Sequence, residues 1–144
     1  MPVRAEIKKT LQYEGGYSFD PNDPGGETNF GISKRYHPDL DIKNLTEEQA
    51  EEIYLKEYWH PMNCDQYANA SYRWIVFDCS VNPGIGHAKQ FIAQVAHSDA
   101  EEGCRELSKL RADHYRAIAS EHPKEAKYLN GWLRRANDLG TDLT

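Results

Sequence analysis

Residues 14–33 read EGGYSFDPNDPGGETNFGIS. A single carboxylate, Glu14, stands near the start of this stretch, and a loop crowded with Asp, Pro and Gly follows it. Repeated Asp-Pro and Gly-Gly pairs predict turns or a small hairpin. Loops held between rigid elements are where binding and catalytic side chains concentrate. We therefore expect functional side chains in this part of the chain.

The residues before Glu14 predict an amphipathic helix that ends at this carboxylate. Val3, Ile7 and Leu11 recur every four residues and form one apolar stripe. Glu14 continues the stripe, and Gly15 is typical of a helix C-terminus. Partial burial and the negative end of the helix dipole would both favour the protonated acid, as a general acid at neutral pH requires. From helix position alone, a partly exposed Glu with an ordinary pKa is the more frequent outcome.

Two loop carboxylates, Asp20 and Asp23, each precede a proline. Turn formation through Asx hydrogen bonds is the more frequent role for Asp20, whereas turn formation and catalysis are evenly balanced for Asp23. Thr28 is a third polar group that the loop could bring back over the helix end. A calcium loop starting at Asp20 is excluded because Pro24 and Gly31 occupy positions that require ligands.

The composition limits the partners and the classes of protein. A length of 144 residues predicts one domain over residues 1–144 with a proper core. The formal charge of −6 argues against nucleic acid as a partner. Residues 103–136 nevertheless hold 8 Lys or Arg against 4 Asp or Glu, which suits either an anionic polymer or a solvated helix face.

The sequence also indicates the compartment. Three cysteines exclude complete disulfide pairing, and Cys79 and Cys104 lie in apolar helical patterns typical of buried thiols. The chain shows no apolar signal core and no run long enough to span a membrane. We therefore expect synthesis in the cytoplasm without a signal peptide, and no stable insertion into a membrane.

Residues 29–59 predict mostly helix. Residues 29–37 are expected to form a short helix or turn before Pro38. Thr46 and Gln49 match a capping box, and the helix that they begin should run to about Trp59.

The remaining chain is also expected to be helical. Residues 70–84 carry almost no polar face, which predicts a central buried helix, with a strand as the competing interpretation. Ser98 with Glu101 matches a second capping box. Helices are also predicted after Ile85 and before Gly140. The predicted fold class is mainly α, with about six helices and an irregular loop or small hairpin after the first.

Other chemistries find less support. The residues that could bind zinc show no recurrent ligand spacing: His60, Cys64, Cys79, His87 and Cys104. No local signature indicates a cysteine nucleophile. We therefore expect no metal and no cofactor. Carboxylates remain, and glycoside hydrolysis commonly uses a protonated acid with a second group that holds water or stabilises a cationic transition state.

Several motifs carry a resemblance to a known family. The first block consists of Glu14-Gly15-Gly16-Tyr17, Asp20-Pro21, Asp23-Pro24-Gly25-Gly26, Thr28 and Gly31-Ile32-Ser33. Later matches are Tyr54, Tyr58-Trp59, Phe77-Asp78, Val81-Asn82 and Gly84. Together they resemble the peptidoglycan-cleaving N-acetylmuramidases of glycoside hydrolase family 108, which occur among phage endolysins and prophage genes. The resemblance covers roughly residues 1–95 and returns weakly at residues 131–133.

This resemblance implies a lysozyme-like domain that hydrolyses the β-1,4 bond between N-acetylmuramic acid and N-acetylglucosamine. Glu14 matches the catalytic Glu of the family's Glu-Gly-Gly-Tyr motif. Asp23 follows Glu14 at the spacing seen in phage lysozymes, but their Thr position is occupied here by Asn29, and Thr28 comes one residue earlier. Asp23 and Thr28 therefore both remain candidates for the second catalytic group.

The resemblance also suggests binding residues and partners. Tyr17 and Tyr58 would offer flat faces to sugar rings, Asn82 would offer an amide to an N-acetyl group, and Asn29 is a further candidate; core packing is the alternative role. The expected partner is the peptidoglycan glycan strand. A separate holin-type membrane protein would release the chain to the cell wall in the periplasm.

Two other functions remain open. A lytic transglycosylase could use the same Glu14, and a non-catalytic peptidoglycan-binding or secretion-assisting protein could keep the fold. The longer wall-binding region of many family members is not recognisable in residues 96–130.

Overall fold

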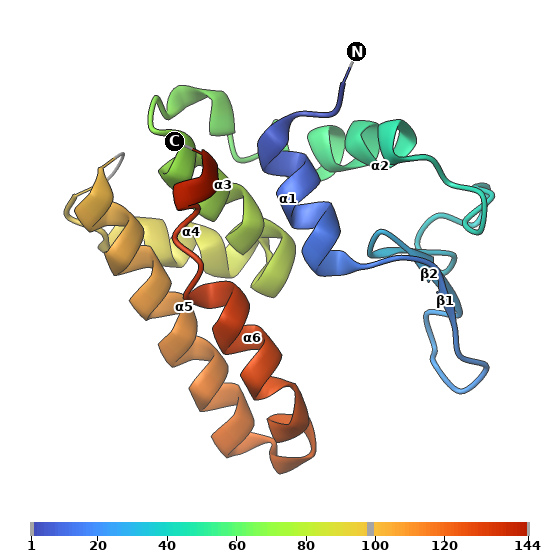
Figure 1. Ribbon diagram of the computed structural model, residues 1–144. Coiled ribbons are helices and arrows are strands. Elements are labelled where there is room, and N and C mark those ends of the chain that lie inside the picture. The colour runs from blue at the N-terminus through green and yellow to red at the C-terminus, as the bar shows by residue number, and fades with distance from the viewer. Residues whose placement is uncertain (1, 98–99, 144) are drawn as a thin grey trace. The chain divides into compact units, whose positions relative to one another are not determined.

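The computed structural model describes residues 2–97 and 100–143, and the chain forms two compact units, residues 1–57 and residues 58–144 (Figure 1). Six α-helices and one three-stranded sheet occur among the described residues. The expected mainly α fold class, with a small hairpin after the first helix, is confirmed. No helix in the described ranges is long and apolar enough to cross a membrane.

The first unit contains two helices. Helix α1 (Ala5–Glu14) buries Ile7 and Leu11, the residues of the predicted stripe. Helix α2 (Glu47–Tyr54) begins with the predicted capping box, in which Thr46 Oγ1 accepts a hydrogen bond from the Gln49 amide and the Gln49 side chain accepts one from the Thr46 amide. The chain continues beyond α2 as a π-helical turn over Leu55–Trp59, so the helical segment ends where the sequence predicts.

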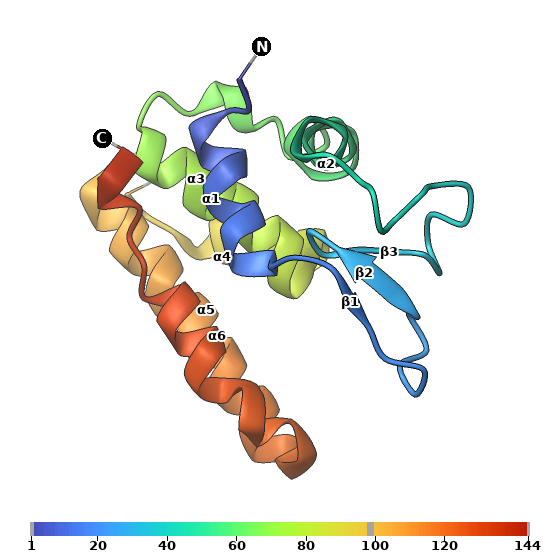
Figure 2. The ribbon, with the colours of Figure 1, turned by 45° about the vertical axis from the view of Figure 1, so that its right-hand side comes forward.

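An antiparallel sheet lies between these helices in the sequence (Figure 2). Its strands are β1 (Ser18–Phe19), β2 (Glu27–Asn29) and β3 (Ile32–Ser33), in that order. Asn29 pairs with Ile32, which leaves Phe30 and Gly31 as a two-residue turn, and both have positive φ (52° and 76°). This backbone is that of a type I′ hairpin turn.

The prediction of a short helix or turn over residues 29–37 is correct for the turns and wrong for the helix, because β3 and the end of β2 lie in this range. The short strands of β2 and β3 contain only two or three residues, too few for a period-2 pattern to emerge from the sequence. Turns do follow β3, and the side-chain ammonium of Lys34 donates to the Leu40 carbonyl across them (2.7 Å).

The second unit is helical and is built around α3 (Ala70–Cys79), in which only Ala70 and Arg73 are not buried. The prediction of a central buried helix is confirmed, but the α-helix stops at Cys79 and not at residue 84. A π-helical turn, Ser80–Gly84, follows, and within it Asn82 has an extended backbone (φ −150°, ψ 113°). Asn69 caps the start of α3 by accepting a hydrogen bond from the Tyr72 amide (3.0 Å).

Three more helices complete this unit: α4 (Ile85–Gln94), α5 (Glu101–Glu121) and α6 (Leu129–Ala136). Short 3-10 turns occur at Cys64–Gln66, Pro123–Tyr128 and Thr141–Leu143. Helices α5 and α6 lie side by side in both views (Figures 1 and 2). Tyr115 of α5 stacks on Trp132 of α6. Ser98 of the second predicted capping box lies outside the described residues.

A buried ion cluster joins three helices of the second unit. Asp78 of α3 is fully buried and forms two 2.8 Å contacts with the guanidinium of Arg135 on α6. Arg111 of α5, also buried, lies 2.8 Å from the same carboxylate. The two buried arginines therefore share one carboxylate, which holds α3, α5 and α6 together through charged hydrogen bonds.

All three cysteines are free and buried, which confirms the predicted reduced thiols. Desolvation raises the pKa of the Cys79 thiol to about 11. At neutral pH this thiol is therefore protonated and a poor nucleophile.

Candidate active site

Glu14 is the last residue of α1, as the sequence predicts. The amide of Gly15 closes the helix by donating to the Leu11 carbonyl (3.1 Å), and Gly15 itself has a φ of 86°. The side chain of Glu14 is half-buried. The carboxyl group thus lies at the C-terminal end of α1.

The hairpin turn packs directly against Glu14. A Cβ atom placed on Gly31 would lie 3.0 Å from both Cγ and Cδ of Glu14. In addition, the Phe30 amide donates to the Gly15 carbonyl immediately after the helix (3.1 Å). The main chain of the Phe30–Gly31 turn therefore contacts the carboxyl-bearing end of the Glu14 side chain.

Tyr54 of α2 completes this arrangement. Its hydroxyl donates to the Phe30 carbonyl at 2.6 Å, and the same hydroxyl would lie 2.7 Å from a Cβ on Gly31. Tyr54 is only 2% exposed. Three elements, α1, the β2–β3 turn and α2, thus meet at Glu14. We call Glu14, Phe30, Gly31 and Tyr54 the acid cluster.

Sequence reasoning missed two members of the acid cluster as contributors to the site. Gly31 and Tyr54 belong to the motifs that carry the family resemblance, but no role followed from their positions. A Gly between two strands is a hairpin signal, and here it was the one signal that could have located the turn. The partner of Tyr54 lies 24 residues away and has no local signature.

Asp20 and Asp23 form local turns. The Oδ1 atom of Asp20 accepts from the Asn22 amide (2.9 Å), and the Oδ1 atom of Asp23 accepts from the Gly25 amide (2.8 Å). Both side chains are exposed. The sequence predicts such Asx turns as one of two possible roles for Asp20 and Asp23. A catalytic role for Asp23 stays a prediction.

Thr28 lies at the centre of the sheet. It pairs with Ser18 on one side and with Ser33 on the other. Directly opposed residues of an antiparallel sheet place their side chains on the same face. Ser18, Thr28 and Ser33 therefore form a row of three hydroxyl groups, with the half-buried Thr28 in the middle.

The two other candidates in the first unit have defined partners. Asn29 is buried, and its amide nitrogen donates to the carbonyls of Ile42 (3.0 Å) and Lys43 (3.4 Å), which attaches the hairpin to the following loop. Tyr17 is exposed, and its hydroxyl donates to Glu27 (2.9 Å). Desolvation and this bond raise the pKa of Tyr17. The Tyr17 ring is 42% exposed, and the Lys43 ammonium lies over it, 6.0 Å from the ring centroid.

Tyr58 and Asn82 belong to the second unit. Tyr58 is half-buried, and its carbonyl accepts from the Met62 amide (3.1 Å). The carbonyl of Asn82 accepts from Arg111 (2.6 Å), and its side-chain Oδ1 lies 2.8 Å from the Tyr115 hydroxyl. The side-chain oxygen of Asn82 is thus already engaged within the unit.

One surface hollow lies beside the hairpin and is lined by Phe19, Pro24, Gly25, Gly26, Glu27, Lys34 and Arg35. It combines an exposed aromatic ring with two cations and borders the strand pair Phe19–Glu27.

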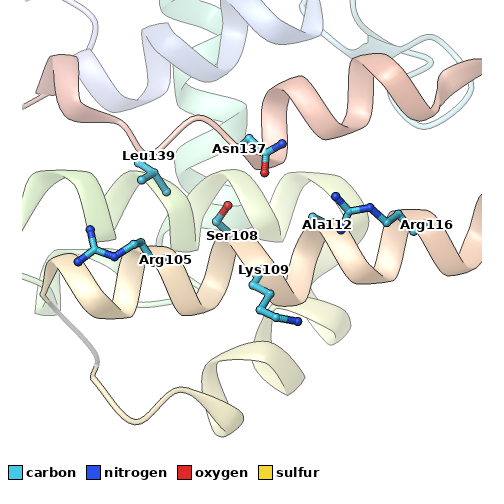
Figure 3. A pocket seen from close by; sticks show the side chains of 7 residues that line it. All are labelled: Arg105, Ser108, Lys109, Ala112, Arg116, Asn137 and Leu139. Atoms are coloured by element: carbon cyan, nitrogen blue, oxygen red, sulfur yellow. The ribbon is translucent and has the colours of Figure 1, made fainter.

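A second hollow lies along α5 (Figure 3), where Ser108 points toward the segment after α6. Its three cations are paired within α5: Arg105 with Glu101 and Glu102, and Lys109 and Arg116 with Asp113. It contains none of the predicted catalytic residues.

Comparisons with known proteins identify relatives. The sequence model of the family described as "Glycosyl hydrolase 108" matches residues 7–84, a range that contains the acid cluster and every candidate site residue. A solved structure entitled "Structure of Brucella abortus SagA" aligns with a TM-score of 0.72 and 22% identity, over 92% of this chain and 88% of that chain. At this identity the likeness shows a shared fold. No curated protein matches the chain significantly.

Proposed function

Because the chain belongs to glycosyl hydrolase family 108 and is a peptidoglycan-degrading glycosidase, we propose that it is an N-acetylmuramidase with Glu14 as its general acid. The bond cleaved is the β-1,4 linkage between N-acetylmuramic acid and N-acetylglucosamine. The observation that carries this assignment is the acid cluster, in which a half-buried carboxyl group is fixed at a helix C-terminus against the hairpin turn.

The proposed reaction uses Glu14 in its protonated form. Glu14 donates its proton to the glycosidic oxygen as the bond to C1 of the muramic acid breaks, and an oxocarbenium-like transition state develops. Water supplies the hydroxyl group to C1, and its remaining proton restores the acid. A neutral acid suits this step because the proton must already be present when the leaving group departs.

Thr28 is the second group that we assign. It lies in the central strand, where pairing on both sides fixes its backbone, and its hydroxyl can orient water without a charge. Asp23 has one carboxylate oxygen engaged in a turn of an exposed loop. Rigid elements hold catalytic groups more accurately than loops do, which favours Thr28 over Asp23.

Two isosteric variants separate these candidates. Thr28→Val keeps the shape and removes the hydroxyl, and Asp23→Asn removes the charge but keeps the oxygen that accepts from the Gly25 amide. We expect Thr28→Val to lower kcat by about 10-fold or more and Asp23→Asn by less, measured as release of soluble sugars from purified sacculi. The reverse order would assign the role to Asp23.

Glu14→Gln tests the central assignment. The amide cannot donate a proton as an acid does, so kcat on purified sacculi should fall by about 10²- to 10⁴-fold. Glu121→Gln is a matched control, since Glu121 is an exposed Glu at the last position of α5, and it should retain wild-type activity. A folded Glu14→Gln protein that lyses sacculi at the wild-type rate would remove Glu14 from the mechanism.

Mass spectrometry of the released fragments identifies the reaction. Reducing N-acetylmuramic acid ends are expected from hydrolysis. Anhydro ends would instead show a lytic transglycosylase acting through the same Glu14, and binding to sacculi without soluble products would show a non-catalytic wall-binding protein.

The substrate also sets the expected place of action. Peptidoglycan lies outside the inner membrane, so the chain would act in the periplasm, with release by a separate holin-type membrane protein as part of the proposal. Tyr17 and Tyr58 are the residues that we propose for sugar contacts, because their rings are exposed or half-exposed. Asn29 and Asn82 would contribute by holding the backbone around them.

A further inference from the structure

Two histidines on neighbouring helices of the second unit face each other. His87 lies in the first turn of α4, and His114 lies in the middle of α5. Their ring centroids are 4.3 Å apart, and the ring planes are tilted by 44°. Because 27 residues separate them, no ligand spacing in the sequence could have indicated the pair.

Aromatic neighbours fix the two rings from the side. Phe91 packs near both, with centroid distances of 6.4 Å to His87 and 5.7 Å to His114. Tyr115 lies 6.0 Å from His114. His87 is exposed and His114 is half-buried, so the pair is open to solvent on one side.

The nitrogens of these two rings differ from those of His37 and His97. His37 lies 2.9 Å from Glu57, and His97 lies 2.5 Å from Glu106, so each has a carboxylate partner. Within residues 2–97 and 100–143, neither His87 nor His114 shows a hydrogen bond or ion pair. An uncharged imidazole offers one nitrogen lone pair to a ligand.

The separation of the rings fits a shared ion. With nitrogen–metal bonds of about 2.1 Å, two imidazoles on one ion have centroids roughly 4.5 to 5.2 Å apart for coordination angles between square and tetrahedral. The observed distance of 4.3 Å is slightly below the lower value, which corresponds to an angle a little smaller than a right angle at the ion. Imidazole nitrogen suits Ni²⁺, Cu²⁺ and Zn²⁺ and is a poor ligand for Mg²⁺.

We propose that His87 and His114 form a binding site for one divalent first-row transition-metal ion, with water as the remaining ligands. No group of three or more metal-binding side chains occurs among the described residues, so the site has two protein ligands. It is separate in its residues from the acid cluster, and glycosidic hydrolysis by Glu14 does not depend on it.

Nickel binding to the full-length, untagged protein tests this site. Calorimetric titration with NiCl₂ should show one ion bound per chain. An ion concentration about a hundredfold above the Kd should raise Tm by about 5 to 10 °C. MgCl₂ at the same concentration should leave Tm unchanged. Calorimetry at low temperature reports the folded chain, in which all three thiols are buried and cannot compete.

Variants locate the ion. His87→Ala should abolish both the heat of binding and the rise in Tm, and His87→Phe should do the same while keeping an aromatic ring beside Phe91. His60→Ala is the control, because His60 is another exposed histidine of the same unit, and it should bind Ni²⁺ as the wild type does. Absence of binding in the wild type, or unchanged binding in folded His87→Ala and His87→Phe proteins, would overturn the proposal.

Discussion

Gly31 meets two requirements that a larger residue cannot meet together. Its φ of 76° lies in the left-handed region, and its α-carbon faces Glu14 and the Tyr54 hydroxyl at distances that leave no room for a methyl group. We therefore expect Gly31→Ala to destabilise the protein by about 1 to 3 kcal/mol, since backbone strain and a displaced neighbour add together. Activity on sacculi should fall by about 10-fold or more, because the acid must move.

Gly16→Ala provides the matched control for this substitution. Gly16 lies two residues after Glu14, but a Cβ atom there would meet nothing within 4 Å. Its stability, from urea unfolding, and its activity should stay near wild type. Equal losses in the two variants would show that chain flexibility after α1 matters and that the contact with Glu14 does not.

The position of Glu14 could be predicted from the sequence because it depends on neighbours within one helix. Ile7 and Leu11 predict the apolar stripe and Gly15 predicts the end of the helix, and α1 does end at Glu14. Asn29 could not be predicted in the same way. Its amide binds carbonyls 13 and 14 residues away, so the sequence shows a polar residue in a motif and nothing about what it holds.

One side chain of α2, Tyr54, helps to attach the β2–β3 hairpin. Tyr54→Phe would leave the Phe30 carbonyl without the donor that now lies 2.6 Å away. A lost hydrogen bond of this kind reduces the free energy of unfolding by about 1 to 2 kcal/mol. We also expect a several-fold loss of kcat on sacculi, because the turn that contacts Glu14 becomes less well fixed.

Tyr36→Phe removes the same hydroxyl from a ring that is 74% exposed. Thermal unfolding and activity of this variant should match the wild type. A Tyr54→Phe protein with unchanged activity and lower stability would mean that the hydroxyl holds the fold without influencing the acid.

At the level of elements, long periodic segments and the hairpin after α1 were predicted correctly, whereas the strand within residues 29–37 was not. Thr46 and Gln49 locate the start of α2 because a capping box is a local pattern. The helix that the sequence extends over residues 70–84 stops at Cys79, because the extended backbone of Asn82 interrupts it. Residues 29–37 lacked the length for a clear period, and a positive φ at Phe30 is uncommon for an aromatic residue.

For the molecule as a whole, stability should depend strongly on the buried ion cluster of the second unit. Asp78 contacts Arg135 through both carboxylate oxygens. Arg135→Met removes both contacts of this guanidinium with a fully buried carboxylate, which keeps its contact with Arg111. We expect a loss of about 3 kcal/mol in the free energy of unfolding, because breaking a buried pair exposes its desolvation penalty.

Arg134→Met is the control for this change, since it alters the preceding, exposed residue of the same helix. Its effect in urea unfolding should remain within about 0.5 kcal/mol. Similar losses in both variants would contradict a specific role for the cluster. The sequence places Asp78 in an apolar helix. It cannot reveal the cationic partners of Asp78, because Arg111 and Arg135 lie 33 and 57 residues later in the chain.

The loop between β1 and β2 is held by its own short-range bonds. Asp20 and Asp23 bind amides two residues ahead, and main-chain bonds join Asp20 to Asp23 and Asp23 to Gly26. Glu14, the proposed proton donor, packs instead against the Phe30–Gly31 turn, which Tyr54 holds by a hydrogen bond. With Thr28 as the second catalytic group, we expect residues 20–26 to accept a loop of another length or charge without any change in the contacts that hold Glu14.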